Sequence, residues 1–396
     1  MPLHMSEKPL GQVVGKSTQP LALVFESRFE GHTLGYARDL AQQTAVAGFE
    51  VALALNIQSQ TQPEYLQIEE NEFNYYWCDS PITSYKSPEG GLLDLQKISE
   101  LYKELKPEKI IVPSADSIMS AMGTCAESRA IAATLPPMDL IGHWYNVGAF
   151  PTGVRSAKSI LQNLHEVRRL RKHRMYSCDP FTSIGAGRWV FHAGGCRPPR
   201  FIPLPLGPQY AGNQAEARSM FDLNSERHYV VAVGGISPRK ECGILLEAIG
   251  RKDWPQDIGV MCMGPIHNSL KSLLNHTRKR FGDRLVVVED FLSEEEFSAG
   301  FVAADAVWSL KRTKGVSSTS LHAAKAHRPS LVSKYDASAT WLQSRIGPGI
   351  QIALDSHSVI RGVAEVMHCP EQTEEQRAFL ERMTDPNGFV RILESS

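Results

Sequence analysis

The sequence lacks several features that would assign the chain to a specific class. Its formal net charge is −1, so no overall field favours nucleic acid. No run of about 18 apolar residues could span a membrane, and no internal repeat or low-complexity block is present. Residues 1–19 lack the apolar core of a signal peptide, and we expect a loose tail there. These absences indicate a globular protein of the cytoplasm.

Cysteines show no pairing pattern. Their number is odd and no two form a C-x-x-C pair, which argues against a disulfide framework and against a structural zinc site. We expect buried free thiols in a reducing compartment. The cysteines are Cys78, Cys125, Cys178, Cys196, Cys242, Cys262 and Cys369.

The first half alternates between apolar runs and helical periodicity. Residues 20–25 and 50–55 read as strands, and 34–47 between them has apolar residues at helical spacing. A strand–helix–strand unit implies a parallel sheet. The pattern continues with helices at 95–105 and 155–174, a mostly helical stretch at 114–134, and strands at 109–112, 138–143, 175–178 and 200–203.

A second alternation follows a segment rich in proline, glycine and polar residues, 205–226. At 396 residues two domains are expected. We predict an α/β fold of two Rossmann-like lobes facing a central cleft, where ligands of such sheets bind. The predicted parts are a tail (1–19), a first domain (20–208), a linker (209–227), a second domain (228–372) and a C-terminal helix (373–396) packing back on the first domain.

Residues 303–333 form the most informative stretch. They read as strand 306–310, a polar loop 311–317, helix 318–326 with Ser317 or Ser318 as N-cap, and strand 330–333 after Pro329. A loop that leads into a helix N-terminus presents free N–H groups and the positive end of a dipole. Such a site suits a phosphate or a polar sugar.

Several motifs resemble those of retaining glycosyltransferases of family four, which have the two-lobed GT-B fold. In the second half these are residues 233–240 with Leu245-Leu246-Glu247-Ala248, the Ala304-Asp305 pair, and Arg328-Pro329. Weaker matches in the first half are Gly31-His32, Lys106-Pro107, His143 and Ile202-Pro203. The resemblance covers about residues 20–370.

The resemblance implies a transferase of the kind used in bacterial glycan biosynthesis. It would move a sugar from a nucleotide-diphosphate donor, held by the second lobe, to a glycan, lipid-linked or small-molecule acceptor held by the first. Retention of configuration follows from the resemblance alone. No cofactor and no metal are expected, and the sequence has no Asp-x-Asp motif.

The sequence departs from this family at charged positions. Gly235 stands where the family has an arginine, and Lys314 and His322 stand where it has paired glutamates. A histidine could still accept a hydrogen bond from the donor ribose. A lysine reverses the charge and could bind a diphosphate or an acidic sugar. Arg239 could replace part of the charge that is lost at Gly235.

Each candidate residue has an ordinary structural alternative. Lys240 would neutralise the diphosphate, or is an exposed lysine in a first helical turn. Backbone and hydroxyl groups of Gly315, Val316, Ser317 and Ser318 would bind phosphate or sugar, or form a plain loop with an N-cap.

The acceptor lobe offers a second set of candidates. Gly31 would allow close approach of the ligand, and His32 and His143 would act on the acceptor or the donor sugar. Alternatively these residues form turns and satisfied structural side chains. Glu26 and Glu30 are candidate acid/base groups.

A basic segment at 155–174 leaves two interpretations open. Leucines and a valine at helical spacing accompany seven basic residues. The helix could dock on anionic lipid, or could pack through its leucines on its own lobe with a solvated charged face. The basic residues are Arg155, Lys158, Arg168, Arg169, Arg171, Lys172 and Arg174.

Three functional hypotheses follow. The first is a sugar transferase, and the second is a protein of the same fold that binds a sugar nucleotide or a partner without transfer. The replaced glutamates and arginine motivate the second. The third is a sugar-nucleotide epimerase of similar two-lobed shape, which would interconvert donors without an acceptor.

Overall fold

The chain consists of two compact units in a computed structural model. The first unit contains residues 1–147, 151–205 and 385–396, and the second contains 148–150 and 206–384. The structure describes residues 19–28, 33–61, 73–79, 87–142, 168–185, 188–193, 195–204, 206, 210, 212–311 and 317–394.

The first unit is built on a parallel sheet of seven strands in the order β3-β2-β1-β4-β5-β6-β7. The inner strands are short apolar segments, and burial on both faces explains why they lack polar alternation. The strands are β1 (Leu21–Glu26), β2 (Glu50–Asn56), β3 (Asn74–Cys78), β4 (Lys109–Val112), β5 (Asp139–Gly142), β6 (Arg174–Ser177) and β7 (Arg200–Phe201).

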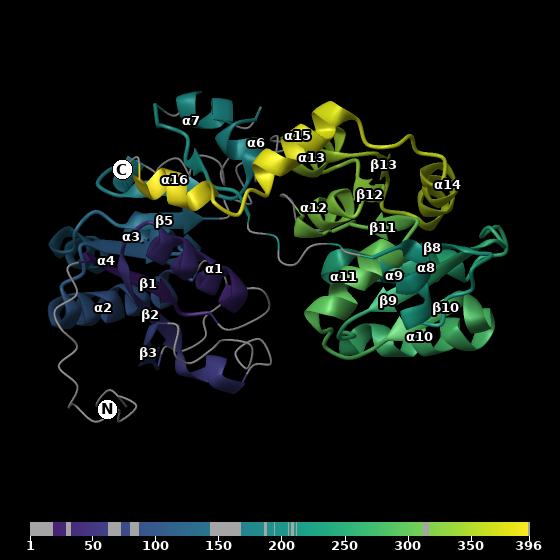
Figure 1. Cartoon of the computed structure of the whole chain (residues 1–396), viewed down its shortest axis with the longest axis horizontal. Helices are drawn as coiled ribbons and strands as arrows, with labels where there is room; N and C mark the ends of the chain where they lie inside the picture. The colour runs from purple at the N-terminus through teal and green to yellow at the C-terminus, as the bar shows by residue number, and fades with distance from the viewer. Residues whose placement is uncertain are drawn as a thin grey trace. The chain divides into compact units, whose positions relative to one another are not determined.

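Helices cover both faces of this sheet. On one face α1 packs with α16, which comes from the other end of the chain, and the Phe389 N–H donates to Gln43 Oε1 at 3.1 Å (Figure 1). On the other face α2, α3 and α4 bury a second apolar cluster. The helices are α1 (Thr33–Val46), α2 (Pro88–Leu105), α3 (Asp116–Thr124), α4 (Ala126–Thr134), α6 (Pro180–Ser183), α7 (Trp189–Ala193), α16 (Gly388–Glu394) and the 3₁₀ turn η1 (Ile57–Thr61).

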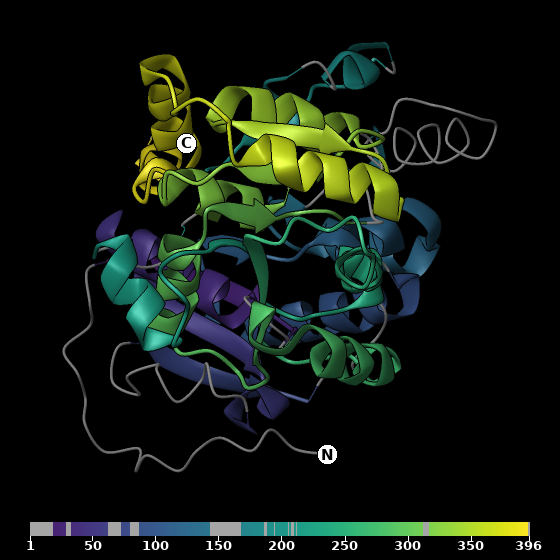
Figure 2. The same cartoon turned by 90° about the vertical axis from the view of Figure 1, so that its right-hand side faces the viewer.

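The second unit has a parallel sheet of six strands in the order β10-β9-β8-β11-β12-β13. Helices α9, α10 and α14 bury one face and α8, α11 and α12 bury the other. Figure 2 shows α14, near the yellow end of the colour bar, crossing the face of the sheet.

The strands of this unit are β8 (His228–Val233), β9 (Ile258–Met263), β10 (Leu285–Val288), β11 (Ala306–Trp308), β12 (Ser330–Ser333) and β13 (Gly349–Ile352). Its helices are α8 (Gln214–Met220), η4 (Pro238–Lys240), α9 (Cys242–Ile249), α10 (Asn268–Phe281), η5 (Gly282–Arg284), α11 (Glu294–Ala303), α12 (Ser318–Lys325), α13 (Ala337–Ile346), α14 (Ser356–Val366) and α15 (Glu374–Met383).

Each sheet has one point where the order of its strands reverses. In the first unit this point lies between β1 and β4, and the helices that follow them, α1 and α3, pack on opposite faces. In the second unit it lies between β8 and β11, followed by α9 and α12 on opposite faces. Chains that diverge in this way leave a crevice at the carboxyl edge of the strands, where α/β proteins bind ligands. The predicted fold class of two Rossmann-like sheets is confirmed.

One helix prediction is wrong at its end: residue 174 begins β6, so the helix predicted at 155–174 does not extend that far. Residues 114–134 are mostly helical, as predicted, and an extended backbone at Cys125 divides them into α3 and α4. The segment expected as a linker, 209–227, contains helix α8, which Asn213 caps. The C-terminal part, 373–396, contains two helices, α15 and α16.

Some features of the described part of the chain agree with expectation. All seven cysteines lie in this part and are free. No helix within it is long and apolar enough to cross a bilayer. Thr373 caps α15 in a capping box with Gln376.

The close contact between α2 and α3 predicts that Gly91 tolerates no side chain without loss of stability. A Cβ on Gly91 would overlap the Ser117 carbonyl and lie 2.8 Å from the Ile118 nitrogen, whereas a Cβ on Gly35 in α1 would meet nothing within 4 Å. We expect Gly91→Ala to destabilise the first unit by about 3 kcal/mol. Gly35→Ala should stabilise it by about 0.5 kcal/mol. Scanning calorimetry of both variants checks this, and equal melting temperatures would contradict it.

Candidate functional site

Lys240 lies at the carboxyl edge of the second sheet, beside the point of strand reversal. Strand β8 ends at Val233, and the chain returns through Gly234 and a short turn, so that Lys240 folds back over the loop. Its ammonium group donates to the Val233 carbonyl at 2.7 Å. Burial lowers the pKa of Lys240 to about 8, and the neighbouring charge of Arg239 adds to this effect. The site therefore holds a partly buried cation that is hydrogen-bonded to its own loop.

Glycine is required on both sides of this loop. Gly234 has φ +82°, and a Cβ there would lie 2.8 Å from Lys240 Nζ. Gly264, after the neighbouring strand β9, has φ +113°, and its Cβ would lie 2.8 Å from the Gly234 carbonyl. The two loops continue side by side, and the Ile236 N–H donates to the Pro265 carbonyl at 2.9 Å. Close backbone packing thus fixes the loop that carries Lys240.

The other side of the strand reversal is formed by the start of α12. Ser317 is the N-cap residue, as predicted, but its hydroxyl makes no cap hydrogen bond to the helix. Instead it accepts from Ser309 Oγ at 3.0 Å, and Ser309 also bonds Ser320 Oγ at 2.7 Å. Because the Ser317 hydroxyl bonds Ser309, it satisfies none of the first N–H groups of α12. Such a helix start attracts an anion.

The remaining predicted donor contacts are placed differently. Gly235 and Arg239 are exposed beside Lys240, and Ser318 is the first residue of α12. His322 lies among aromatic rings: it stacks on Phe301 at 5.3 Å, and Nδ1 bonds the Tyr210 hydroxyl. These contacts are those of a packed side chain.

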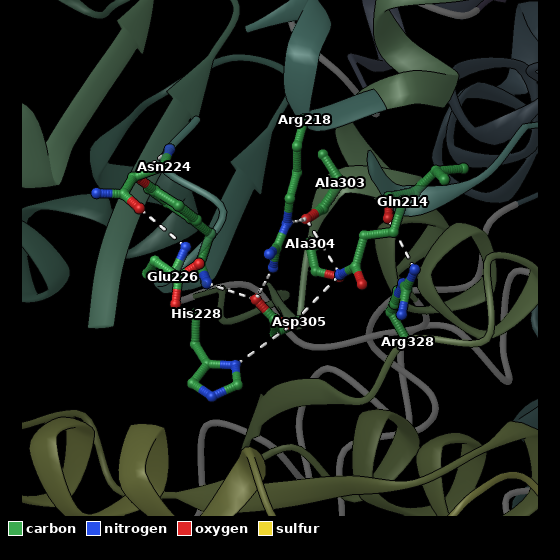
Figure 3. Close-up of polar contacts among 11 residues, drawn as sticks. Gln214, Arg218, Asn224, Glu226, His228, Ala303, Ala304, Asp305 and Arg328 are labelled. Carbon is green, nitrogen blue, oxygen red and sulfur yellow. Dashed lines mark hydrogen bonds and ion pairs between the residues drawn. The ribbon is translucent and has the colours of Figure 1, made fainter. Parts of the chain in front are cut away.

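Asp305 lies at the opposite, amino edge of the sheet. The Tyr229 N–H donates to its Oδ2 at 2.7 Å, Arg218 forms an ion pair with the same oxygen, and His228 Nδ1 lies 3.4 Å from Oδ1. Figure 3 shows the side chains of Gln214, Arg218 and His228 directed toward it. Asp305 belongs to the Ala304-Asp305 pair that resembles the family motif. Its contacts give it a structural role, which is to join α8, β8 and β11.

The carboxyl edge of the first sheet carries buried polar groups. Glu26 ends β1 and is 2% exposed, and the Arg28 N–H donates to its Oε1 at 2.9 Å. Burial raises the pKa of Glu26 to about 7, although the Ser114 hydroxyl and the Arg28 charge offset part of this rise. Asn56, at the end of β2, holds the same loop through the Ser27 carbonyl at 3.0 Å.

Part of the basic segment packs on its own unit. Arg169 donates to the Gly123 carbonyl, Lys172 to the Leu135 carbonyl at 2.6 Å, and Arg174 Nε pairs with Asp139 Oδ1 at 2.6 Å. Leu170 is fully buried. In residues 168–174 the packed interpretation is therefore the better one, and 155–167 lie outside the described residues.

Several predicted site residues also lie outside the described residues. They are Glu30, Gly31, His32, His143, Lys314, Gly315 and Val316.

Sequence reasoning missed three residues of the two edges. Ser309 follows β11 directly and was assigned to the strand, and Ser114 was assigned to a helix. Trp308 donates from Nε1 to the Lys240 carbonyl at 2.8 Å. The sequence feature that could have identified Ser309 and Ser114 is a hydroxyl-bearing residue just after a buried strand.

The buried carboxyl of Glu26 predicts a pH-dependent stability. A pKa of about 7 in the folded state, against about 4.5 when unfolded, means that the folded chain keeps a proton that the unfolded chain loses. Stability should therefore fall as pH rises from 4.5 to 7. Glu26→Gln removes this loss and should be more stable than wild type by up to about 3 kcal/mol above pH 7. Denaturation at several pH values measures this, with the exposed Glu108→Gln as the control, and parallel profiles for Glu26→Gln and wild type would contradict it.

Comparisons with known proteins agree on the fold. No family model matches the sequence, and no curated protein sequence matches it. Among solved structures, the glycosyltransferase WaaG of lipopolysaccharide biosynthesis is 12% identical with a TM-score of 0.61, over 95% of this chain and all of that one.

One further structure was solved with a nucleotide and a sugar, and another is named for a sugar nucleotide. HepE of Anabaena, solved with UDP and glucose, is 13% identical with a TM-score of 0.61, over 95% of this chain and 97% of that one. The UDP-GlcNAc 2-epimerase of Methanocaldococcus jannaschii is 10% identical with a TM-score of 0.58, over 95% of this chain and 99% of that one. At these identities the likeness shows the fold, which is that of GT-B proteins.

Proposed function

We propose that this protein is a glycosyltransferase that moves a sugar from a nucleotide-diphosphate donor to an acceptor. The observation that carries the proposal is Lys240, a partly buried cation held over its loop at the carboxyl edge of the second sheet. A diphosphate gains negative charge when the sugar leaves it, and a preorganised cation stabilises that charge. Structures of this fold include sugar transferases, one of them solved with UDP and glucose.

The donor would lie across the strand reversal between β8 and β11. Lys240 and Arg239 would face the diphosphate from one loop, with Gly235 leaving room for it. The first turn of α12, with Ser317 and Ser318, would supply N–H groups from the other side. In this proposal these groups replace a divalent ion. The roles of His32, His143 and the 314–316 loop rest on the family resemblance alone.

His322 is left out of the proposed donor contacts, because Phe301 and Tyr210 already enclose it. This packing favours a second candidate, a protein of the same fold that binds a sugar nucleotide without transferring the sugar. Binding of a donor with no transfer, no hydrolysis and no change of the sugar would identify that protein. Conversion of the donor sugar without an acceptor would identify an epimerase.

Donor binding should depend on Lys240. We expect Lys240→Ala to weaken nucleoside-diphosphate binding on the order of 30-fold, equivalent to about 2 kcal/mol for a charged hydrogen bond. Lys252→Ala, which removes an exposed charge after α9, should leave it unchanged. Calorimetry with UDP, GDP and ADP in the presence of EDTA measures both. No binding by the wild type, or equal binding by Lys240→Ala, would exclude the proposed site.

The same residue predicts the pH dependence of binding. With a pKa of about 8, Lys240 loses its charge as pH rises above 8, while the diphosphate requires the charged form. Affinity should therefore fall by up to about tenfold per pH unit above pH 8, with uptake of a proton on binding. A pH-independent affinity up to pH 10 would contradict this.

The product should keep the anomeric configuration of the donor sugar, as the resemblance to family four implies. Proton NMR of the first product formed, before mutarotation, distinguishes retention from inversion. Inversion would remove the retaining part of the proposal and leave the donor site intact.

A further inference from the structure

A buried tryptophan joins the two sides of the strand reversal in the second sheet. Trp308 is the last residue of β11 and is 2% exposed. Its indole Nε1 donates to the Lys240 carbonyl at 2.8 Å, although 68 positions separate the two residues in the sequence. Strand β11 lies beside β8, whose following loop carries Lys240. The bond therefore ties that loop to the neighbouring strand.

The carbonyl that Trp308 binds belongs to an unusual turn. Residues 238–240 form η4, and Glu241 follows with φ +52°, which separates η4 from the start of α9. Residues other than glycine seldom adopt this left-handed conformation. It persists where surrounding contacts impose it. The hydrogen bond from Trp308 is a contact of this kind, because it holds the residue just before Glu241.

The indole ring also packs beneath the turn. Trp308 shares one buried apolar cluster with Ile236, which precedes the turn, and with Cys242 and Leu245, which follow it. Residues on both sides of Lys240 are thus anchored in the core that contains the ring. The ring and its N–H act together on the main chain of this short segment.

The two ends of Lys240 have different partners. Its ammonium group bonds the Val233 carbonyl at 2.7 Å, and its own carbonyl accepts from Trp308. A diphosphate would compete with Val233 for the ammonium group, but it would leave the bond between Trp308 and the main chain in place. A fixed main chain lowers the entropy that is lost when the side chain binds a ligand.

We propose that Trp308 is a positioning residue for the donor, because its indole N–H fixes the main chain of Lys240 where the ammonium group reaches the diphosphate. This role rests on the proposed function. Trp308 touches neither the donor nor the reacting atoms, and it acts through Lys240 alone. Loss of the indole N–H removes a partner of the Lys240 carbonyl, and the turn shifts to satisfy that carbonyl in another way.

The alternative is that the bond from Trp308 serves stability only, and the chain offers a matched comparison. Trp254 is also 2% exposed, belongs to the same apolar cluster, and donates from Nε1 to the Ile258 carbonyl at 2.9 Å. Ile258 begins β9, at the amino edge of the sheet. The two tryptophans differ in position, and Trp308 is the one bonded to Lys240.

The first test compares Trp308→Phe with Trp254→Phe in the full chain. Phenylalanine keeps an aromatic ring and removes the indole N–H. Both variants should melt at a lower temperature than the wild type. Calorimetry with UDP, GDP and ADP in the presence of EDTA should show weaker binding for Trp308→Phe alone, by about tenfold. Equal affinities of the two variants would overturn the positioning role.

A double-mutant cycle tests whether Trp308 acts through Lys240. In a chain that already carries Lys240→Ala, addition of Trp308→Phe should cause no further loss of affinity. Independent contributions would multiply instead. A further loss of about tenfold in the double variant would show that Trp308 acts by another route and would overturn the proposal.

The pH profile of binding gives a readout that a loss of stability alone does not move. Burial lowers the pKa of Lys240 to about 8, Arg239 lowers it further, and Cys242 opposes this effect. A shifted turn exposes the ammonium group, so its pKa rises toward the ordinary value. The affinity of Trp308→Phe should therefore begin to fall at a higher pH than that of the wild type. Coincident profiles would contradict the proposal.

The wild type provides a measurement that does not depend on the folding of Trp308→Phe. In NMR spectra, the assigned indole N–H signal of Trp308 should shift on addition of UDP, and that of Trp254 should not. Equal responses of the two signals would overturn the role of Trp308.

The outcomes distinguish this role from the proposed function. Failure of the wild type to bind UDP, GDP or ADP would overturn both. Binding that depends on Lys240 but is the same in both tryptophan variants would overturn the positioning role and leave the donor site standing.

Discussion

The pairing of β8 with β11 is the contact on which the donor side depends, and Asp305 holds it. The two strands share only two register pairs, Ala306 with Val230 and Val307 with Val231. Asp305 extends this short ladder at the amino edge, because its N–H donates to the Tyr229 carbonyl and its carboxylate accepts from the Tyr229 N–H. Arg218 neutralises that carboxylate. The Asp305–Arg218 ion pair at the amino edge therefore stabilises the pairing of β8 with β11. The proposed ligand would lie at the opposite, carboxyl edge of the same strands.

The two edges of each sheet differ in how well their polar groups are satisfied. At the amino edge of the second sheet Asp305 has partners from several elements. At the carboxyl edges burial instead lowers the pKa of Lys240 and raises the pKa of Glu26, at a cost in stability for the charged forms. A loss of stability of this kind is typical of positions where a bound ligand compensates for it. The difference between the amino and carboxyl edges is therefore the physical argument for function at the carboxyl edges.

Periodicity predicted most of the fold, because buried parallel strands and the helices between them leave strong patterns. It predicted β4 and β12 to the residue. It missed β3, whose aromatic side chains contact clusters on both faces and so show no polar alternation. The site was harder: the sequence indicated Lys240, but the family pattern placed His322 at the donor, whereas it packs on Phe301. Tertiary packing decides whether a side chain such as His322 faces a ligand or packs against its neighbours. A sequence motif contains no information on that packing.

Among the described residues, the charged groups beside the two strand reversals differ. Beside β8 and β11 lie Lys240 and Arg239, and beside β1 and β4 lie Glu26 and Arg28, with the carboxyl of Asp94 acting on Glu26. Under the proposed function a diphosphate would be attracted to the first edge, and the two carboxyls would oppose its binding at the second. Discrimination between donor and acceptor would then arise from electrostatics within each unit. Reversing the charge at one edge should therefore misdirect ligands rather than unfold the chain.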